Sequence, residues 1–203
     1  MKKFAALILL VFFTTSCKKN NKDSKVENKT IEVSKKAPTI KTKSQNTTTY
    51  LCQINGENWA YTKASGIIST HAKTGKRTAI ITFKKKLEKG SESIQLRYDA
   101  NSSELEVVSI QLKFQKKEGE VFTCFYELFP DTRDRHPESE LSGTIDLSDP
   151  SSASGVAEIK NLNIKYEKEK LQNPDDAVIS ITGLKFTDIG YSDIDKITKS
   201  YKK

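Results

Sequence analysis

Residues 93–99 read SIQLRYD, and in this stretch Ile94, Leu96 and Tyr98 alternate with polar neighbours. Successive side chains of a β-strand point to opposite faces, so a two-residue period collects the apolar side chains on one face. The segment therefore predicts a strand with one face in a core and the other in solvent.

Similar apolar segments recur along the chain from residue 50 onward. They predict further strands at residues 50–55, 59–61, 66–70, 78–83, 104–114, 121–129, 141–147, 156–166 and 178–189. Turn dipeptides such as Asn55-Gly56 and Thr74-Gly75 separate them. Short strands in series predict an all-β fold, an antiparallel curved sandwich or barrel of about 8–10 strands.

Three of the long predicted strands change phase midway. Their apolar positions switch parity between Val107 and Val108, between Ile159 and Leu162, and at Gly183. One inserted residue, a β-bulge, would restore the inward face, and bulges bend strands where a sheet curls or closes. We therefore expect a curved sheet, and the pattern leaves sandwich and closed barrel as alternatives.

The last residues predict a short C-terminal helix. Ser192 can cap it, Asp193 and Asp195 suit its first turn, and Ile194 and Ile197 fall on one face. With this helix, residues 49–203 form a single predicted all-β domain.

The amino-terminal segment has the features of a signal peptide. Lys2 and Lys3 precede the apolar run AALILLVFF at residues 5–13, which is too short to span a bilayer. The following stretch FFTTSC, ending at Cys17, resembles the lipobox of bacterial lipoproteins, in relaxed form because Thr14 stands where the family usually has Leu. The alternative is an ordinary signal peptide with an incidental cysteine.

The resemblance implies that residues 1–16 are removed and that Cys17 carries acyl chains such as palmitate. Two acyl chains anchor a protein stably to a membrane, whereas one is marginal. Lys18 follows the cysteine in place of the aspartate that marks inner-membrane retention, so the resemblance favours the outer membrane of the cell envelope, with the leaflet left open.

The positive charge of the chain lies in its amino-terminal part. The whole chain carries a net charge of +8, but residues 49–203 hold 23 lysines and arginines against 23 aspartates and glutamates. Residues 17–48 are rich in Lys, Asn, Thr and Ser and predict a lipidated cysteine followed by a flexible basic tether. A neutral domain without a nucleic-acid-binding module predicts no nucleic-acid partner.

Cys52 and Cys124 lie in separate predicted strands. An exported protein can form a disulfide between them, which would close a loop of about 70 residues and stabilise the fold. The equal alternative is two unrelated buried thiols.

The most polar predicted loop is PDTRDRHPESE at residues 130–140. The loop lacks the turn glycine of a calcium loop, so we expect it to be solvated and internally paired, without a metal. It is also the first candidate for a recognition loop, with the residues Asp131, Arg133, Asp134, Arg135 and His136.

The sequence offers no catalytic or cofactor motif. His71 and His136 are the two histidines, and neither has a second ligand at zinc spacing. Trp59 lies in CQINGENWAY, residues 52–61, which resembles the opening strand of uncharacterised exported β domains; it is expected to pack in the core, and the alternative is stacking on a ligand such as a sugar.

These observations predict a membrane-anchored lipoprotein of the cell envelope that is noncatalytic, needs no cofactor and binds or scaffolds an envelope protein or glycan. One alternative is a carrier of small apolar ligands in a β barrel. Another is a periplasmic enzyme inhibitor, since the domain resembles the bacterial lysozyme inhibitors in its general architecture.

Overall fold

The computed structural model describes residues 47–200; the predicted signal peptide, Cys17, nearly all of the tether and the last three residues lie outside this range. The described part contains ten strands, one α-helix and three short 3-10 helices. Their bounds are β1 Thr49–Ile54, β2 Glu57–Tyr61, β3 Lys63–Thr70, β4 Arg77–Lys86, β5 Ser91–Asp99, β6 Leu105–Gln115, β7 Val121–Leu128, η1 Pro130–Arg135, β8 Glu140–Asp146, β9 Ser152–Asn163, η2 Lys168–Lys170, η3 Pro174–Ala177, β10 Val178–Asp193 and α1 Ile194–Ser200.

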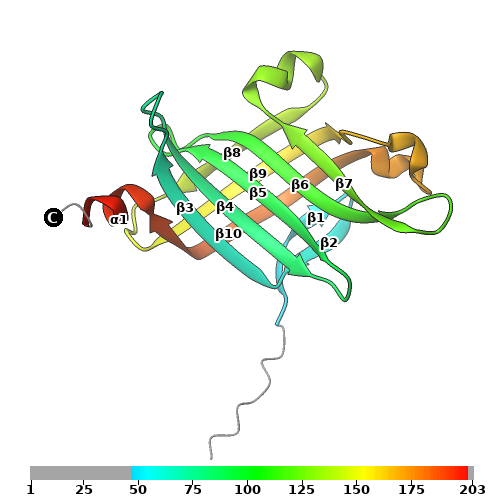
Figure 1. The fold of residues 1–203 in the computed structure, drawn as a ribbon, viewed down its shortest axis with the longest axis horizontal. Coiled ribbons are helices and arrows are strands. Elements are labelled where there is room, and N and C mark those ends of the chain that lie inside the picture. The colour runs from blue at the N-terminus through cyan, green and yellow to red at the C-terminus, as the bar shows by residue number, and fades with distance from the viewer. Residues whose placement is uncertain (1–46, 201–203) are drawn as a thin grey trace, which may run out of the picture. The chain divides into compact units, whose positions relative to one another are not determined.

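The strands form two curved layers that share β10. One layer has the order β2-β1-β10-β9-β8, and the other continues from the far end of β10 through β3, β4, β5 and β6 to β7 (Figure 1). The prediction of an all-β fold is confirmed. Of the two predicted architectures, sandwich and closed barrel, the protein has the sandwich, because its sheet does not close into a barrel. Every strand pair is antiparallel except β10 with β3, which is parallel.

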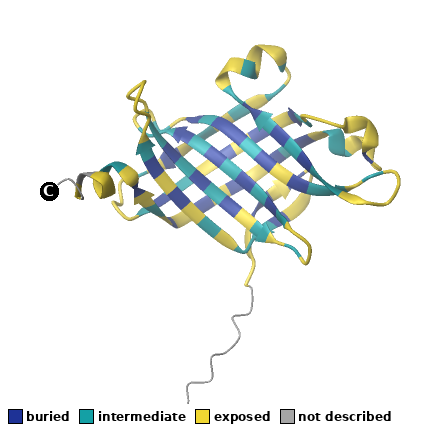
Figure 2. Ribbon diagram, viewed as in Figure 1, coloured by how far each residue is buried: buried dark blue, intermediate teal, exposed yellow. Residues whose placement is uncertain are grey.

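The core lies between the layers and follows the predicted alternation. Along β5, Ile94, Leu96 and Tyr98 are fully buried and their neighbours are partly exposed, and the same checkerboard of buried positions runs over the adjacent strands (Figure 2). Phe83 of β4 packs against Phe186 of β10 with ring centroids 5.4 Å apart, so aromatic contacts join the two layers.

The two bulges predicted in β9 and β10 are present, whereas the one in β6 lies between Leu105 and Val107, one residue before its predicted place, so Val107 turns outward. The pairing of β5 with β6 shifts where Arg97 faces Val107 and Tyr98 faces Leu105. The pairing of β9 with β10 shifts on both sides of Ile181, and Asn161 and Gly183 have positive φ at these points. These extra residues bend the strands that carry one layer over the other.

The helix prediction needs one correction. Ser192 and Asp193 belong to β10, where they pair in parallel with β3, and α1 begins at Ile194. The capping bond comes from Asp193, whose Oδ1 accepts a hydrogen bond from the backbone N–H of Lys196 at 3.4 Å.

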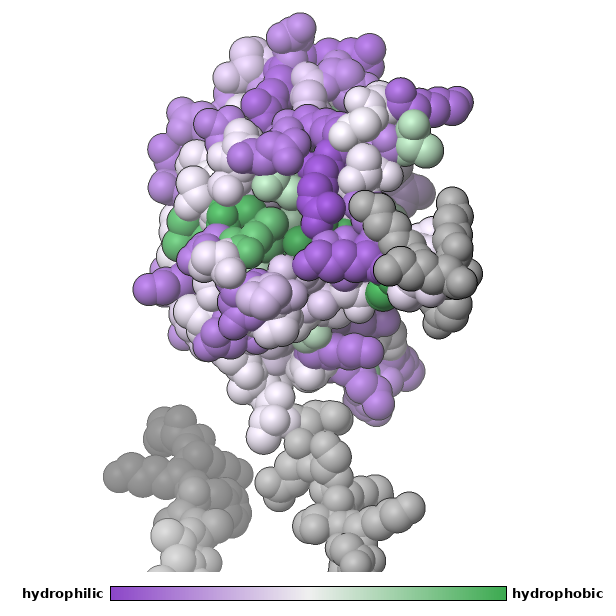
Figure 3. Space-filling model, turned by 90° about the vertical axis from the view of Figure 1, so that its left-hand side faces the viewer, coloured by the Kyte–Doolittle hydropathy of each residue, from purple (hydrophilic) through white to green (hydrophobic). Residues whose placement is uncertain are grey.

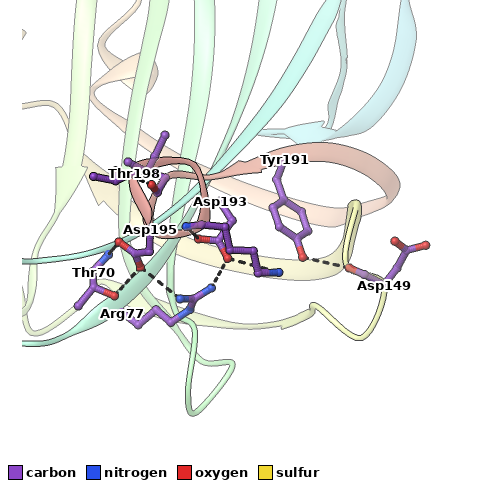
Figure 4. A network of polar contacts seen from close by, with 9 residues as sticks. Thr70, Arg77, Asp149, Tyr191, Asp193, Asp195 and Thr198 are labelled. Carbon is purple, nitrogen blue, oxygen red and sulfur yellow. Dashed lines mark hydrogen bonds and ion pairs between the residues drawn. The ribbon is translucent and has the colours of Figure 1, made fainter. Parts of the chain in front are cut away.

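A polar network holds α1 at the end of β3 and β4 (Figure 4). The Arg77 guanidinium lies 2.6 Å from Asp193 and 3.2 Å from Asp195. Thr70 donates its hydroxyl to Asp195 at 2.7 Å. These contacts join β3 and β4 to β10 and α1, which lie at the other end of the domain's sequence.

No helix within residues 47–200 is long and apolar enough to cross a membrane. Seen from the end that carries α1, the surface is mostly hydrophilic and has one compact hydrophobic area (Figure 3). Ile194 and Ile197 of α1 are among the exposed large hydrophobic residues of the described chain.

Candidate binding site

The two cysteines of the domain are buried and unbridged. Cys52 lies in β1 and Cys124 in β7, and both side chains belong to the core. Burial raises the pKa of the Cys52 thiol to about 12 and is the main cause that raises that of Cys124 to about 11. Of the two alternatives for these cysteines, the structure has the two separate buried thiols and no disulfide between them.

The predicted recognition loop begins with η1. The Arg133 guanidinium donates to the carbonyl oxygen of Glu106 in β6 at 3.0 Å, which fixes η1 to the sheet. The expected internal pairing is largely missing. Within the described residues, neither Arg133 nor Arg135 forms an ion pair, and the one pair internal to the loop joins His136 and Glu138 at 4.0 Å. Of the five predicted recognition residues, Asp131 lines a pocket.

A cleft of about 380 Å³ lies where the β1–β2 hairpin, the ends of β4, β5 and β6, and η3 come together. We call it the Trp59 cleft. Trp59 of β2 and Phe114 of β6 provide apolar lining, and Glu92 of β5 lies between them and Lys85. The volume falls within the range of small-molecule sites.

Glu92 is a charged residue on the inner face of the sheet. It shares the parity of Ile94 and Leu96, so the alternation of β5 turns its side chain inward near the start of the strand. Its exposed fraction is 9%. Its Oε2 accepts from the indole Nε1 of Trp59 at 3.0 Å and lies 3.1 Å from Lys85 Nζ, with which it is paired across the strands. Its Oε1 accepts from the backbone N–H of Lys113 at 3.3 Å.

These contacts fix the role of Trp59. Its side chain is 4% exposed and its N–H is already bonded to Glu92, so neither ring face is free to stack on a sugar in this conformation. The expected packing role is confirmed. Trp59 instead orients the carboxylate that lines the cleft.

The rim of the cleft is acidic. Glu57, Asp175 and Asp176 line it, and within the described residues none of them pairs with a lysine or arginine. Partial burial, followed by the negative charge of Glu57, raises the pKa of Asp176. With Glu92, four carboxylates line the cleft against the ammonium groups of Lys85 and Lys113, so the cleft attracts ligands with amino or hydroxyl donors.

This cleft was not predicted from the sequence. One local signal was available, because Glu92 continues the apolar parity of the strand at 93–99 and so places a carboxylate on the buried face. The rest of the cleft comes from segments far apart in sequence. Within residues 47–200 no group of three or more His, Cys, Asp or Glu side chains is arranged to hold a metal ion.

Comparison with known proteins returned no matching family model, no matching curated protein and no matching solved structure.

Proposed function

We propose that this protein is a noncatalytic, lipid-anchored binding protein of the bacterial cell envelope, and that the Trp59 cleft is its ligand site. The observation that carries the proposal is the acidic cleft itself, whose central carboxylate, Glu92, is held in place by three hydrogen-bond and ion-pair contacts. Fixed polar groups in a concave site favour binding, because little side-chain entropy is lost when a ligand arrives.

The anchor rests on the resemblance of residues 12–17 to a lipobox. The predicted tether, residues 18–48, would have a root-mean-square reach of about 30 Å if these 31 residues form a flexible coil. The proposed arrangement keeps the domain at the membrane, favouring the outer membrane, while the cleft stays clear of the lipid headgroups.

The chemistry of the cleft favours a polar ligand with amino groups. Carboxylates at the rim accept hydrogen bonds from hydroxyl and ammonium groups, and Phe114 offers an apolar contact. An envelope glycan that contains amino sugars has this combination. The contacts of Glu92 also support a noncatalytic role, because both of its oxygens are already engaged by groups of the protein itself.

Titration of the full chain with glucosamine oligomers, followed by NMR of the Trp59 indole N–H, tests the proposal. We expect saturable shifts of this signal and of the backbone N–H groups of Asn58 and Asn173, which line the same cleft. N-acetylated oligomers of equal length are the matched neutral ligands and should bind more weakly. Shifts scattered over the surface, or equal binding of both series, would contradict the proposed site.

The apolar-ligand carrier and the enzyme inhibitor remain alternative predictions. The carrier requires an enclosed barrel interior, and the open order of the sheet gives it no specific support. No geometric feature of the described residues favours an inhibitor over a glycan-binding protein.

A further inference from the structure

A second pocket of about 380 Å³ lies on the outer face of the layer that contains β4, β5 and β6. We call it the Arg97 groove. Its floor is formed by Thr78, Arg97 and Val107, one wall by the turn between β3 and β4, and the other wall by Phe129 and Pro130 at the start of η1. In Figure 1 the turn and η1 lie at the same end of the strands of this layer.

Arg97 has apolar neighbours on both sides. The outward parity of β5 places it between Ile80 of β4 and Val107 of β6, its partners in the strand register. Its side chain is half-buried, and within residues 47–200 its guanidinium makes no ion pair and no hydrogen bond with another side chain. Arg97 therefore offers a full set of donors in a partly desolvated place.

The neighbouring charges are engaged with one another. Lys76 Nζ lies 2.5 Å from Glu106 and 3.6 Å from Asp99, so the carboxylate of Glu106 already has a cation. Asp131 is exposed at the rim of the groove and has no cation partner among the described residues. The uncompensated charges of the groove are thus a cation on its floor and a carboxylate at its rim.

The apolar part of the groove, in its floor and in one wall, is held in place by contacts within the protein. Val107 is 5% exposed although it faces outward, and it is the buried aliphatic residue that does not belong to the main core. Phe129 is held by Thr132, whose hydroxyl bonds to both its N–H and its carbonyl oxygen at 3.1 Å. Together with the bond from Arg133 to Glu106, these contacts fix η1 over the sheet.

We propose that the Arg97 groove is a second ligand site and that it binds a small organic carboxylate. The carboxylate accepts two parallel hydrogen bonds from the Arg97 guanidinium, and the apolar part of the ligand lies on Val107, Phe129 and Pro130. Paired charge-assisted bonds of this kind are strong and orient their ligand. This site is independent of the Trp59 cleft, which is lined by different residues.

Calorimetric titration of the full chain with hexanoate, and with hexanamide as its neutral match, tests the inference. We expect hexanoate to bind and hexanamide to bind at least about tenfold more weakly, because a hydrogen bond to a charged group contributes more than one to a neutral group. Arg97→Gln should weaken hexanoate binding by at least about tenfold, whereas Arg97→Lys should retain part of it.

Two further variants test the direction of the charge effect on hexanoate binding. Asp131→Asn removes the rim carboxylate and should tighten hexanoate binding, while Arg135→Gln removes an exposed cation that does not line the groove and should leave it unchanged. Equal affinity for hexanoate and hexanamide, or an unchanged affinity in folded Arg97→Gln, would overturn the proposal. Glucosamine oligomers should not compete with hexanoate, so failure of either site leaves the other separately testable.

Discussion

Glu92 and Asp193 are the two charged side chains that the described chain buries. A buried charge is tolerated when hydrogen bonds and an opposite charge compensate for its lost hydration. Glu92 meets this condition through Trp59, Lys85 and the backbone of Lys113, which come from three different strands. At the scale of the residue, Glu92 therefore both lines the candidate site and links the two layers through its hydrogen bond with Trp59.

Replacement of Glu92 by alanine should destabilise the domain. The change leaves the Trp59 N–H and the Lys85 ammonium without their acceptor, which we expect to cost about 2–4 kcal/mol. Urea unfolding monitored by Trp59 fluorescence measures it. Glu92→Gln, which keeps an acceptor for the indole, should cost less; equal losses in the two variants would contradict the role of these contacts.

Gly155 lies in β9, where neighbouring atoms from β8 on one side and β10 on the other leave no room for a side chain. An added Cβ would lie 2.7 Å from the Phe186 ring and 2.7 Å from the carbonyl oxygen of Thr144. We expect Gly155→Ala to lower the free energy of unfolding by about 1–3 kcal/mol through overpacking.

Gly190→Ala is the matched control for this prediction, because an added Cβ there meets nothing within 4 Å. Its unfolding midpoint in urea should stay near that of the unaltered protein. Equal destabilisation by both alanines would contradict the steric explanation, because the loss of backbone freedom from Gly to Ala by itself favours the folded state.

At the scale of the element, α1 is attached to the sheet through carboxylates. The hydroxyl and backbone N–H of Thr70, and then the charge of Arg77, lower the pKa of Asp195. For Asp193, burial raises the pKa, but the hydrogen bonds from Arg77 and from the backbone of Lys196 outweigh burial, and the net pKa is lowered.

A lowered carboxyl pKa in the folded state gives the stability of this attachment a defined pH dependence. The contribution is fully present above the pKa of an unfolded carboxyl group and is lost as the pH falls through the lower folded values. Arg77→Gln should therefore reduce stability at pH 7 by about 1–2 kcal/mol and by less at pH 3. Urea unfolding at both pH values checks this, and an equal loss at the two would contradict it.

The strands could be predicted because alternation is a local property of the sequence. The partners of each strand could not be predicted. β10 pairs with β9 along one edge and with β1 and then β3 along the other, and its own residues do not indicate which strands these would be. The parallel pairing with β3 also explains why Ser192 and Asp193 extend the strand. Their backbone groups find partners in β3, which residue preference alone does not reveal.

The candidate sites show the same division. The parity of Glu92 could have signalled a buried carboxylate, but its contact with Trp59 joins residues 33 positions apart. Arg97 has the outward position of an ordinary solvated residue. It lacks a charged partner because its neighbours on the two adjacent strands are the apolar residues Ile80 and Val107, which only the strand pairing reveals. The predicted recognition loop contributes Pro130 and Asp131 to the Arg97 groove, whose other lining residues come from segments that no local pattern brings together.

At the scale of the whole molecule, the sandwich offers two separate polar sites on a domain without net charge. The Trp59 cleft is acidic and lies between the layers at one end, whereas the Arg97 groove has a cationic floor and lies on an outer face. In the function proposed above, this domain binds two kinds of ligand while a lipid anchor at Cys17 keeps it at the envelope, and the anchor is the central claim of that proposal.

The most direct test of this claim is intact-mass spectrometry of the protein isolated from membranes, denatured and alkylated with and without prior reduction. We expect a chain that begins at acylated Cys17, with Cys52 and Cys124 alkylated equally in both samples because neither is bridged. A mature chain without acyl groups would contradict the anchored function, and alkylation of these two cysteines only after reduction would contradict the free thiols of the structure.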